Sequence, residues 1–161
     1  MRYRLELLIV AAIAAADQVT KALVVSRLAL HETVPIVPGL LNLTHVLNTG
    51  AAFGVLNQTE FAYKPLIMVA LALVALVGVG VYAAQLPSTH TLPRVGLGLV
   101  LGGAVGNLVD RARQGYVVDF VDVYWRGWHF WAFNVADAAI TVGVCLLIVD
   151  LLRPAPSPDA A

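Results

Sequence analysis

Acidic and amide side chains recur where apolar segments of the chain end or begin. A chain that leaves a membrane and returns on the same side brings such residues together. Two carboxylates held close to one another share a proton, giving a base that activates water beside an acid that protonates an amide. The residue types alone leave open which aspartates pair. The residues that can meet on this face are Asn48, Asn107, Asp110, Arg111, Asp119, Asp122, Asn134 and Asp137.

Other nucleophiles and metal ligands are poorly placed for catalysis. The sequence has no Gly-x-Ser-x-Gly motif, and its serines are dispersed. The histidines, His31, His45, His90 and His129, lack the spacing of a zinc site, and no metal is expected. The single cysteine, Cys145, lies in an apolar run and is expected to be buried and inert. Carboxylates are the catalytic candidates that remain.

Several charged residues also fit purely structural roles. Asp17 and Lys21 are four residues apart, on one helix face, where a buried ion pair that fixes helix register competes with a functional role. Asp110 and Arg111 fit structural salt bridges at a helix end, and Asp150 is expected to pair with Arg153. Asp122 is expected to face water. Asp137 precedes an unbroken apolar segment, where a lone carboxylate is costly and needs a partner.

The composition is that of a membrane protein. Of the 161 residues, 60% are hydrophobic and 12% are charged, and the mean hydropathy is +0.82. A formal net charge of zero excludes the electrostatic signature of a nucleic-acid-binding protein. We predict one membrane-embedded domain, residues 1–153, with a disordered tail at 154–161. Its predicted membrane spans cover residues 5–25, 66–84, 95–110 and 133–152.

The predicted spans form a compact bundle with loops on one face. Gly98, Gly102 and Gly106 recur every four residues on one helix face and permit close helix packing. The first span also fits a secretory signal peptide, but its apolar pattern continues past the alanines and favours a retained helix. The charge count would place the long loops 26–64 and 111–132 in the cytoplasm. Within them, residues 33–37 and 41–47 favour strands, and an aromatic stretch around residues 125–131 is expected at the bilayer surface.

Five motifs in this order resemble the lipoprotein signal peptidase, or signal peptidase II, family of bacteria. The match covers most of the chain and shows no departure at the motif positions. The motifs are DQVTK at residues 17–21, NTGAAFG at 48–54, GGAVGNLVDR at 102–111, VDF at 118–120 and FNVAD at 133–137.

The resemblance implies an aspartyl endopeptidase that removes signal peptides from prolipoproteins, cutting before a diacylglyceryl-modified cysteine. By motif, the catalytic dyad falls on Asp119 and Asp137, whose carboxylates we expect about 3 to 5 Å apart or bridged by one water. The implied partners are the prolipoprotein substrate and membrane lipid, with no metal or other cofactor. The residues that line or support the site are then Asp17, Lys21, Asn48, Gly50, Asn107, Asp110, Arg111 and Asn134.

The family fold implied is an all-α integral membrane protein with four transmembrane helices. A small extracytoplasmic β-sheet cradle and a short surface helix accompany the helices. The family is embedded in the cytoplasmic membrane with cytoplasmic termini, the reverse of the orientation from the charge count, and we expect a monomer. A different class stays open: a proton-coupled carrier or lipid-binding protein in which Asp17, Asp110 and Asp137 relay protons or hold a head group.

Overall fold

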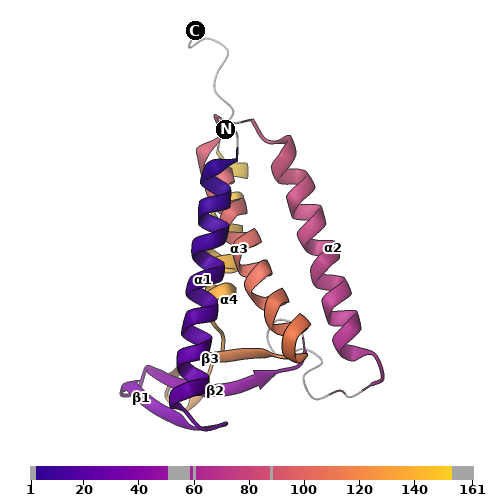
Figure 1. Cartoon of the computed structure of the whole chain (residues 1–161). Helices are drawn as coiled ribbons and strands as arrows, with labels where there is room; N and C mark the ends of the chain where they lie inside the picture. The colour runs from indigo at the N-terminus through magenta and orange to yellow at the C-terminus, as the bar shows by residue number, and fades with distance from the viewer. Residues whose placement is uncertain (1–2, 51–58, 60, 88, 154–161) are drawn as a thin grey trace.

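Four helices stand side by side with a small sheet across one end of the bundle (Figure 1). The computed structural model describes residues 3–50, 59, 61–87 and 89–153. Part of the NTGAAFG motif, residues 51–54, and the predicted tail at 154–161 therefore lie outside the described residues. The start of α1 and the end of α4 lie at the end of the bundle opposite the sheet. The helices are α1 (Arg4–Arg27), α2 (Lys64–Gln85), α3 (Thr91–Gln114) and α4 (Val135–Leu151).

The helices match the predicted spans, with differences at their ends. Helices α1, α2 and α3 are long and apolar enough to cross a membrane. Helix α4 has 17 residues, roughly 26 Å of helix against a hydrocarbon core of about 30 Å. Helix α3 extends past the predicted residue 110 to Gln114, where Gly115 ends it at a φ of 80°. These four account for the helices of the described part, in which the expected short surface helix is not found.

Helix α3 is the central helix, because glycines let its neighbours approach its backbone. A Cβ added at Gly102 would lie 2.9 Å from the Cβ of Ile13 in α1. A Cβ at Gly103 would lie 2.3 Å from the carbonyl oxygen of Ala136 in α4. Both distances are too short for a real side chain, so α1 and α4 pack closely against two neighbouring faces of α3, about 100° apart around its axis. The predicted close packing at the glycine repeat is confirmed for its face toward α1.

The sheet has four antiparallel strands in the order β1-β2-β3-β4. The predicted strands at 33–37 and 41–47 are confirmed as β1 (Thr33–Val37) and β2 (Leu41–Asn48). The second loop, expected only to lie on the surface, adds β3 (Val117–Trp125) and β4 (Trp128–His129). Its aromatic residues, Trp125, Trp128, Phe130 and Trp131, are exposed.

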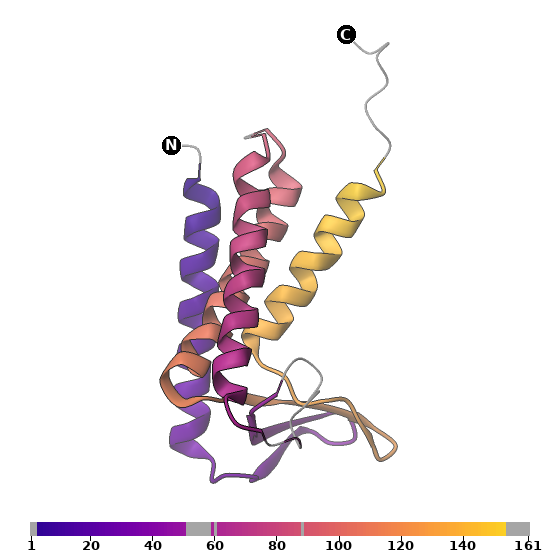
Figure 2. The ribbon, with the colours of Figure 1, turned by 90° about the vertical axis from the view of Figure 1, so that its right-hand side faces the viewer.

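The sheet runs across the end of the helices, as Figure 2 shows. Val24 of α1 packs with Val118 and Phe120 of β3 in a buried apolar cluster. Strand β3 is buried from Val117 to Phe120, so both of its faces are covered there. This packing fixes Asp119, which lies between those apolar residues, at the junction of the sheet and the bundle.

Candidate active site

Asp119 is a buried carboxylate held by two amides from different elements. The residue is only 3% exposed to solvent. Asn48, at the end of β2, donates from Nδ2 to Asp119 Oδ2 at 3.0 Å. Asn134, the residue before α4, donates from Nδ2 to Asp119 Oδ1 at 2.7 Å. Strand β3, strand β2 and the start of α4 therefore meet at this carboxylate.

The surroundings of Asp119 favour its protonated form. Burial and the nearby negative charge of Asp137 raise the pKa of Asp119 from its ordinary 3.8 to about 7. The hydrogen bonds from Asn48 and Asn134 act in the opposite direction, because they stabilise the ionised form. Asp119 can therefore both hold and release a proton near neutral pH.

Asp137 lies in the first turn of α4 and is linked to Asp119 through amide side chains. Asn107 of α3 donates from Nδ2 to Asp137 Oδ1 at 2.8 Å. Asn134 caps the helix by accepting the backbone N–H of Asp137 at 2.9 Å. The Asn134 amide nitrogen also lies 3.3 Å from Asn107 Oδ1. The expected partner of Asp137 is thus found, and one amide network joins both aspartates.

Lys21 neutralises two buried carboxylates beside this network. Its Nζ atom lies 2.7 Å from Asp17 Oδ2 and 2.7 Å from Asp110 Oδ2, and it donates to Asn107 Oδ1 at 3.0 Å. The predicted pair of Asp17 and Lys21 is confirmed. The pairing of Asp110 with Arg111 is wrong, since Asp110 instead faces Lys21 of α1.

Asp17 also holds the beginning of α4. Its Oδ1 atom accepts the backbone N–H of Ala136 at 3.0 Å. The first N–H groups of a helix have no partner within the helix and attract negative charge. Asp17 and Asn134 together satisfy two of these donors, at Ala136 and Asp137. The position of Asp137 therefore depends on a residue in the first helix.

Arg111 secures the loop that carries Asn48. Its guanidinium donates to the carbonyl oxygen of Gly50 at 2.8 Å and to that of Asn107 at 3.4 Å. The Gly50 N–H in turn donates to Asn48 Oδ1 at 3.0 Å. The Asn48 amide is thereby oriented with its nitrogen toward Asp119. Lys64, at the start of α2, donates to Thr49 Oγ1 at 2.9 Å and joins a second helix to this loop.

The structure brings together the predicted site residues as one cluster at the sheet end of the bundle. Two contributors were not predicted, Gln18 and Lys64. Gln18 donates to Asp110 Oδ1 at 2.7 Å, and Lys64 is buried although it begins a helix. Gln18 lies inside the DQVTK motif, which is the signal that could have identified it. Nothing local in the sequence indicates that Lys64 reaches Thr49.

The solvent exposure predicted for Asp122 and the burial predicted for Cys145 are both wrong. Asp122 does not face water: it is 8% exposed, accepts a hydrogen bond from Asn42 Nδ2 at 2.8 Å and lies 2.9 Å from His129 Nδ1. It joins β2, β3 and β4. Cys145 is exposed on the outer surface of α4 and is not buried. An apolar run predicts a membrane helix, but not which of its faces the bundle covers.

The fold and the site define a membrane protein whose buried aspartates suit acid–base chemistry. Four carboxylates, Asp17, Asp110, Asp119 and Asp137, are gathered with three cations, Lys21, Lys64 and Arg111. With more acids than cations, the cluster favours retention of a proton. A family model described as signal peptidase (SPase) II matches residues 9–153, and the chain belongs to this family.

Relatives and solved structures agree with that assignment. A lipoprotein signal peptidase of Symbiobacterium thermophilum is 51% identical over 84% of this chain and 86% of its own length. One of Geobacter metallireducens is 44% identical over 94% of this chain and 92% of its own. A solved structure described as a bacterial membrane enzyme matches with a TM-score of 0.84 at 29% identity, covering 97% of this chain and 92% of the other. The chain is a bacterial membrane protein and a peptidase.

Proposed function

We propose that the protein removes the signal peptide of bacterial prolipoproteins, with Asp119 and Asp137 as an aspartic dyad. The observation that carries the assignment of the dyad is the amide network that connects these two carboxylates. The pKa of about 7 at Asp119 supports it, because a shared proton is what such a dyad needs at neutral pH. The scissile bond is the one before a diacylglyceryl-modified cysteine.

In this mechanism the two aspartates divide acid and base roles. The ionised carboxylate takes a proton from water, and the water oxygen attacks the carbonyl carbon of the scissile peptide bond. The protonated carboxyl polarises the carbonyl oxygen. When the tetrahedral intermediate collapses, the C–N bond breaks and the leaving amine receives a proton from the pair. The proton belongs to both groups, so its titration belongs to the pair.

The remaining polar residues hold the dyad in place. Asn48, Asn107 and Asn134 direct their amide nitrogens at the two carboxylates. Lys21 balances the charges of Asp17 and Asp110, which therefore act as supports. Arg111 fixes the loop at Gly50, so substrate bound there would meet a rigid edge of the site.

We place all four helices in the cytoplasmic membrane, with α4 as a short span. The termini lie in the cytoplasm, and the sheet and dyad lie at the extracytoplasmic face. This orientation lets the substrate keep its lipid in the bilayer while its peptide bond reaches the dyad. The exposed aromatic residues of the β3–β4 hairpin suit the membrane interface. The active unit is a monomer, because one chain supplies both aspartates.

The structure gives little support to a proton-coupled carrier. Such a protein needs polar groups near the middle of the membrane with access from both faces. Here the aspartates gather at the sheet end, and the buried pair of Glu6 and Arg94 lies toward the opposite end. Between these sites α3 packs through Gly98 and Gly102 against apolar residues of α1.

A cleavage assay tests the proposed function. The purified protein in detergent is given a precursor peptide whose cysteine carries diacylglycerol, alongside the same peptide with an unmodified cysteine. We expect cleavage before the modified cysteine and little or no cleavage of the unmodified peptide. Absence of cleavage by the folded wild-type protein would contradict the proposal, and cleavage by the double variant Asp119→Asn/Asp137→Asn would contradict the dyad.

A further inference from the structure

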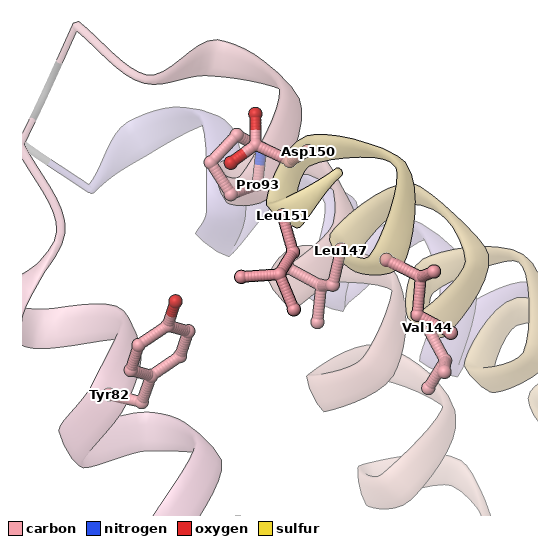
Figure 3. Close-up of a pocket in the computed structure, with 7 residues that line it drawn as sticks. Tyr82, Pro93, Val144, Leu147, Asp150 and Leu151 are labelled. Atoms are coloured by element: carbon pink, nitrogen blue, oxygen red, sulfur yellow. The ribbon is translucent and has the colours of Figure 1, made fainter. Parts of the chain in front are cut away.

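A second feature lies at the end of the bundle away from the dyad, between α2 and the last turns of α4. It is an apolar cavity of about 220 Å³ with one acidic residue, lined by Tyr82, Pro93, Val144, Leu147, Ile148, Asp150 and Leu151. Figure 3 shows Tyr82 of α2 facing Leu147 and Leu151 across the open space, with Asp150 beside Pro93 at the edge.

Asp150 gives this cavity a negative edge. The residue is half-buried and lies in the last turn of α4, where unpaired carbonyl groups add partial negative charge. Among the described residues, the expected ion pair between the side chains of Asp150 and Arg153 is not formed. The two residues are instead joined by a hydrogen bond from the backbone N–H of Arg153 to the carbonyl oxygen of Asp150 at 3.1 Å. The nearby Arg94 is engaged by Glu6. The Asp150 carboxylate is thus placed to meet a cation.

The distance along α4 between the proposed dyad and Asp150 matches the length of the apolar core of a signal peptide. Asp137 and Asp150 are separated by 13 residues of one helix, a rise of roughly 20 Å. Signal peptides consist of a basic n-region followed by an apolar core of about 7 to 15 residues. A helical core of about 13 residues, with its cleavage site at the dyad, would bring the basic n-region level with Asp150.

We propose that the signal-peptide helix of the substrate packs along α4, that the cavity between α2 and α4 receives the apolar side chains next to its n-region, and that Asp150 binds this basic n-region. The proposal rests on the proposed function and adds a second recognition site to it. These apolar side chains pack between Tyr82 and Leu147, and a lysine or arginine of the n-region pairs with Asp150. Asp150 is a specificity residue and takes no part in the chemical step.

Charge variants of enzyme and substrate test the proposal. Two diacylglyceryl precursors that differ only in the n-region, with two lysines or two glutamines, are cleaved by wild type, Asp150→Asn and Asp150→Lys. We expect wild type to have a KM about two- to fivefold lower for the lysine precursor, the range of a partly exposed ion pair. Asp150→Asn should remove the difference and Asp150→Lys should reverse it, with kcat unchanged in each case.

Two controls separate the ion pair from general electrostatics. Glu32→Lys makes the same change of charge at an exposed residue beside the sheet, and it should keep the wild-type preference. In a precursor whose apolar core is four residues longer, the n-region lies about 6 Å further along the helix. With this precursor, most of the preference for lysine over glutamine should be lost. If the preference is the same in wild type, Asp150→Lys and Glu32→Lys, the proposal is wrong.

Measuring the binding of uncleaved precursor tests the role of Asp150 independently of catalysis. The Kd of each uncleaved precursor is measured on the Asp119→Asn background with and without Asp150→Lys. We expect the same charge preference in Kd as in KM. Wild-type protein that cleaves no precursor would overturn the proposed function, whereas Kd values independent of n-region charge would overturn the role of Asp150.

Discussion

Asp119 and Asp137 carry the same side chain in different surroundings. Asp119 is fully enclosed on a strand, with an amide donor on each oxygen. Asp137 is half-buried on the first turn of a helix and accepts one amide donor from Asn107. Unequal surroundings let two carboxylates take different protonation states at one pH. The asymmetry that the proposed acid and base roles require is therefore present in the structure without substrate.

Replacing either aspartate by asparagine tests the dyad directly. Asparagine has nearly the same size but cannot exchange a proton. We expect Asp119→Asn and Asp137→Asn each to lower turnover by about 10³-fold or more, and the double variant to be barely worse than either single one. The measurement is turnover per folded molecule, with precursor binding as the control for folding. Substantial activity in either single variant would transfer the catalytic role to Asp17 or Asp110.

The raised pKa of Asp119 predicts a pH dependence of stability. Its pKa is about 7 in the folded protein against an ordinary 3.8, so the folded state binds more protons between these values. The stabilising contribution is present below about pH 4 and is lost as pH rises through about 7. We expect the melting temperature in detergent to fall across this range and the fall to be smaller in Asp119→Asn. An identical profile in both proteins would contradict the assigned pKa.

At the scale of elements, Lys21 connects α1 to α3 by an ion pair with Asp110 and a hydrogen bond to Asn107, and it also pairs with Asp17 of its own helix. Lys21→Met would leave Asp17 and Asp110 buried without a cation, and removing one partner of a buried pair costs about 3 to 5 kcal/mol. We expect a large drop in melting temperature and folded yield, with Asp17→Asn and Asp110→Asn changing in the same direction. Arg27→Met, at an exposed position of the same helix, is the control and should have little effect. Equal melting temperatures would refute the structural role.

The approach of α4 to α3 gives a second prediction at this scale. Gly103→Ala introduces a methyl group that would lie 2.3 Å from the Ala136 carbonyl oxygen, so α4 must move. Because Asp137 follows Ala136, both melting temperature and turnover should fall. Gly80→Ala in α2, where a Cβ meets nothing within 4 Å, is the matched control. Comparable behaviour of the two variants would show that the contact does not position the dyad.

The elements could be predicted from sequence more fully than their contacts. Hydropathy located all four helices and β-favouring residues located two strands, since both signals are local. The partner of Asp110 could not be found this way: adjacent residues point in different directions on a helix, so Asp110 and Arg111 do not face one another. Asp122 was misplaced because β4, which brings His129 to it, was not predicted. The composition of the site cluster followed from the family motifs, whereas its hydrogen bonds depend on the packing of distant segments.

At the scale of the whole molecule, polar chemistry is kept at the two ends of the bundle. The proposed dyad lies near the sheet, and the Glu6–Arg94 pair joins the first turns of α1 and α3 at the other end of the bundle. The outer helix surfaces are apolar and exposed, and Cys145 belongs to them. We expect Cys145→Ser to leave turnover within a few-fold of wild type, measured in the same cleavage assay. A folded Cys145→Ser protein without activity would show that the nucleophile has been misassigned.

The hydrogen bond between Asp17 and the backbone of Ala136 can form only after α4 has been synthesised. Asp17 belongs to α1 and Ala136 to α4, so α1, α2 and α3 are synthesised before Ala136. A nascent chain carries Asp17, Lys21 and Asp110 long before the helix that presents Asp137 exists. The proposed dyad is therefore completed only when α4 is inserted, and we expect a chain interrupted in translation before α4 to have no peptidase activity.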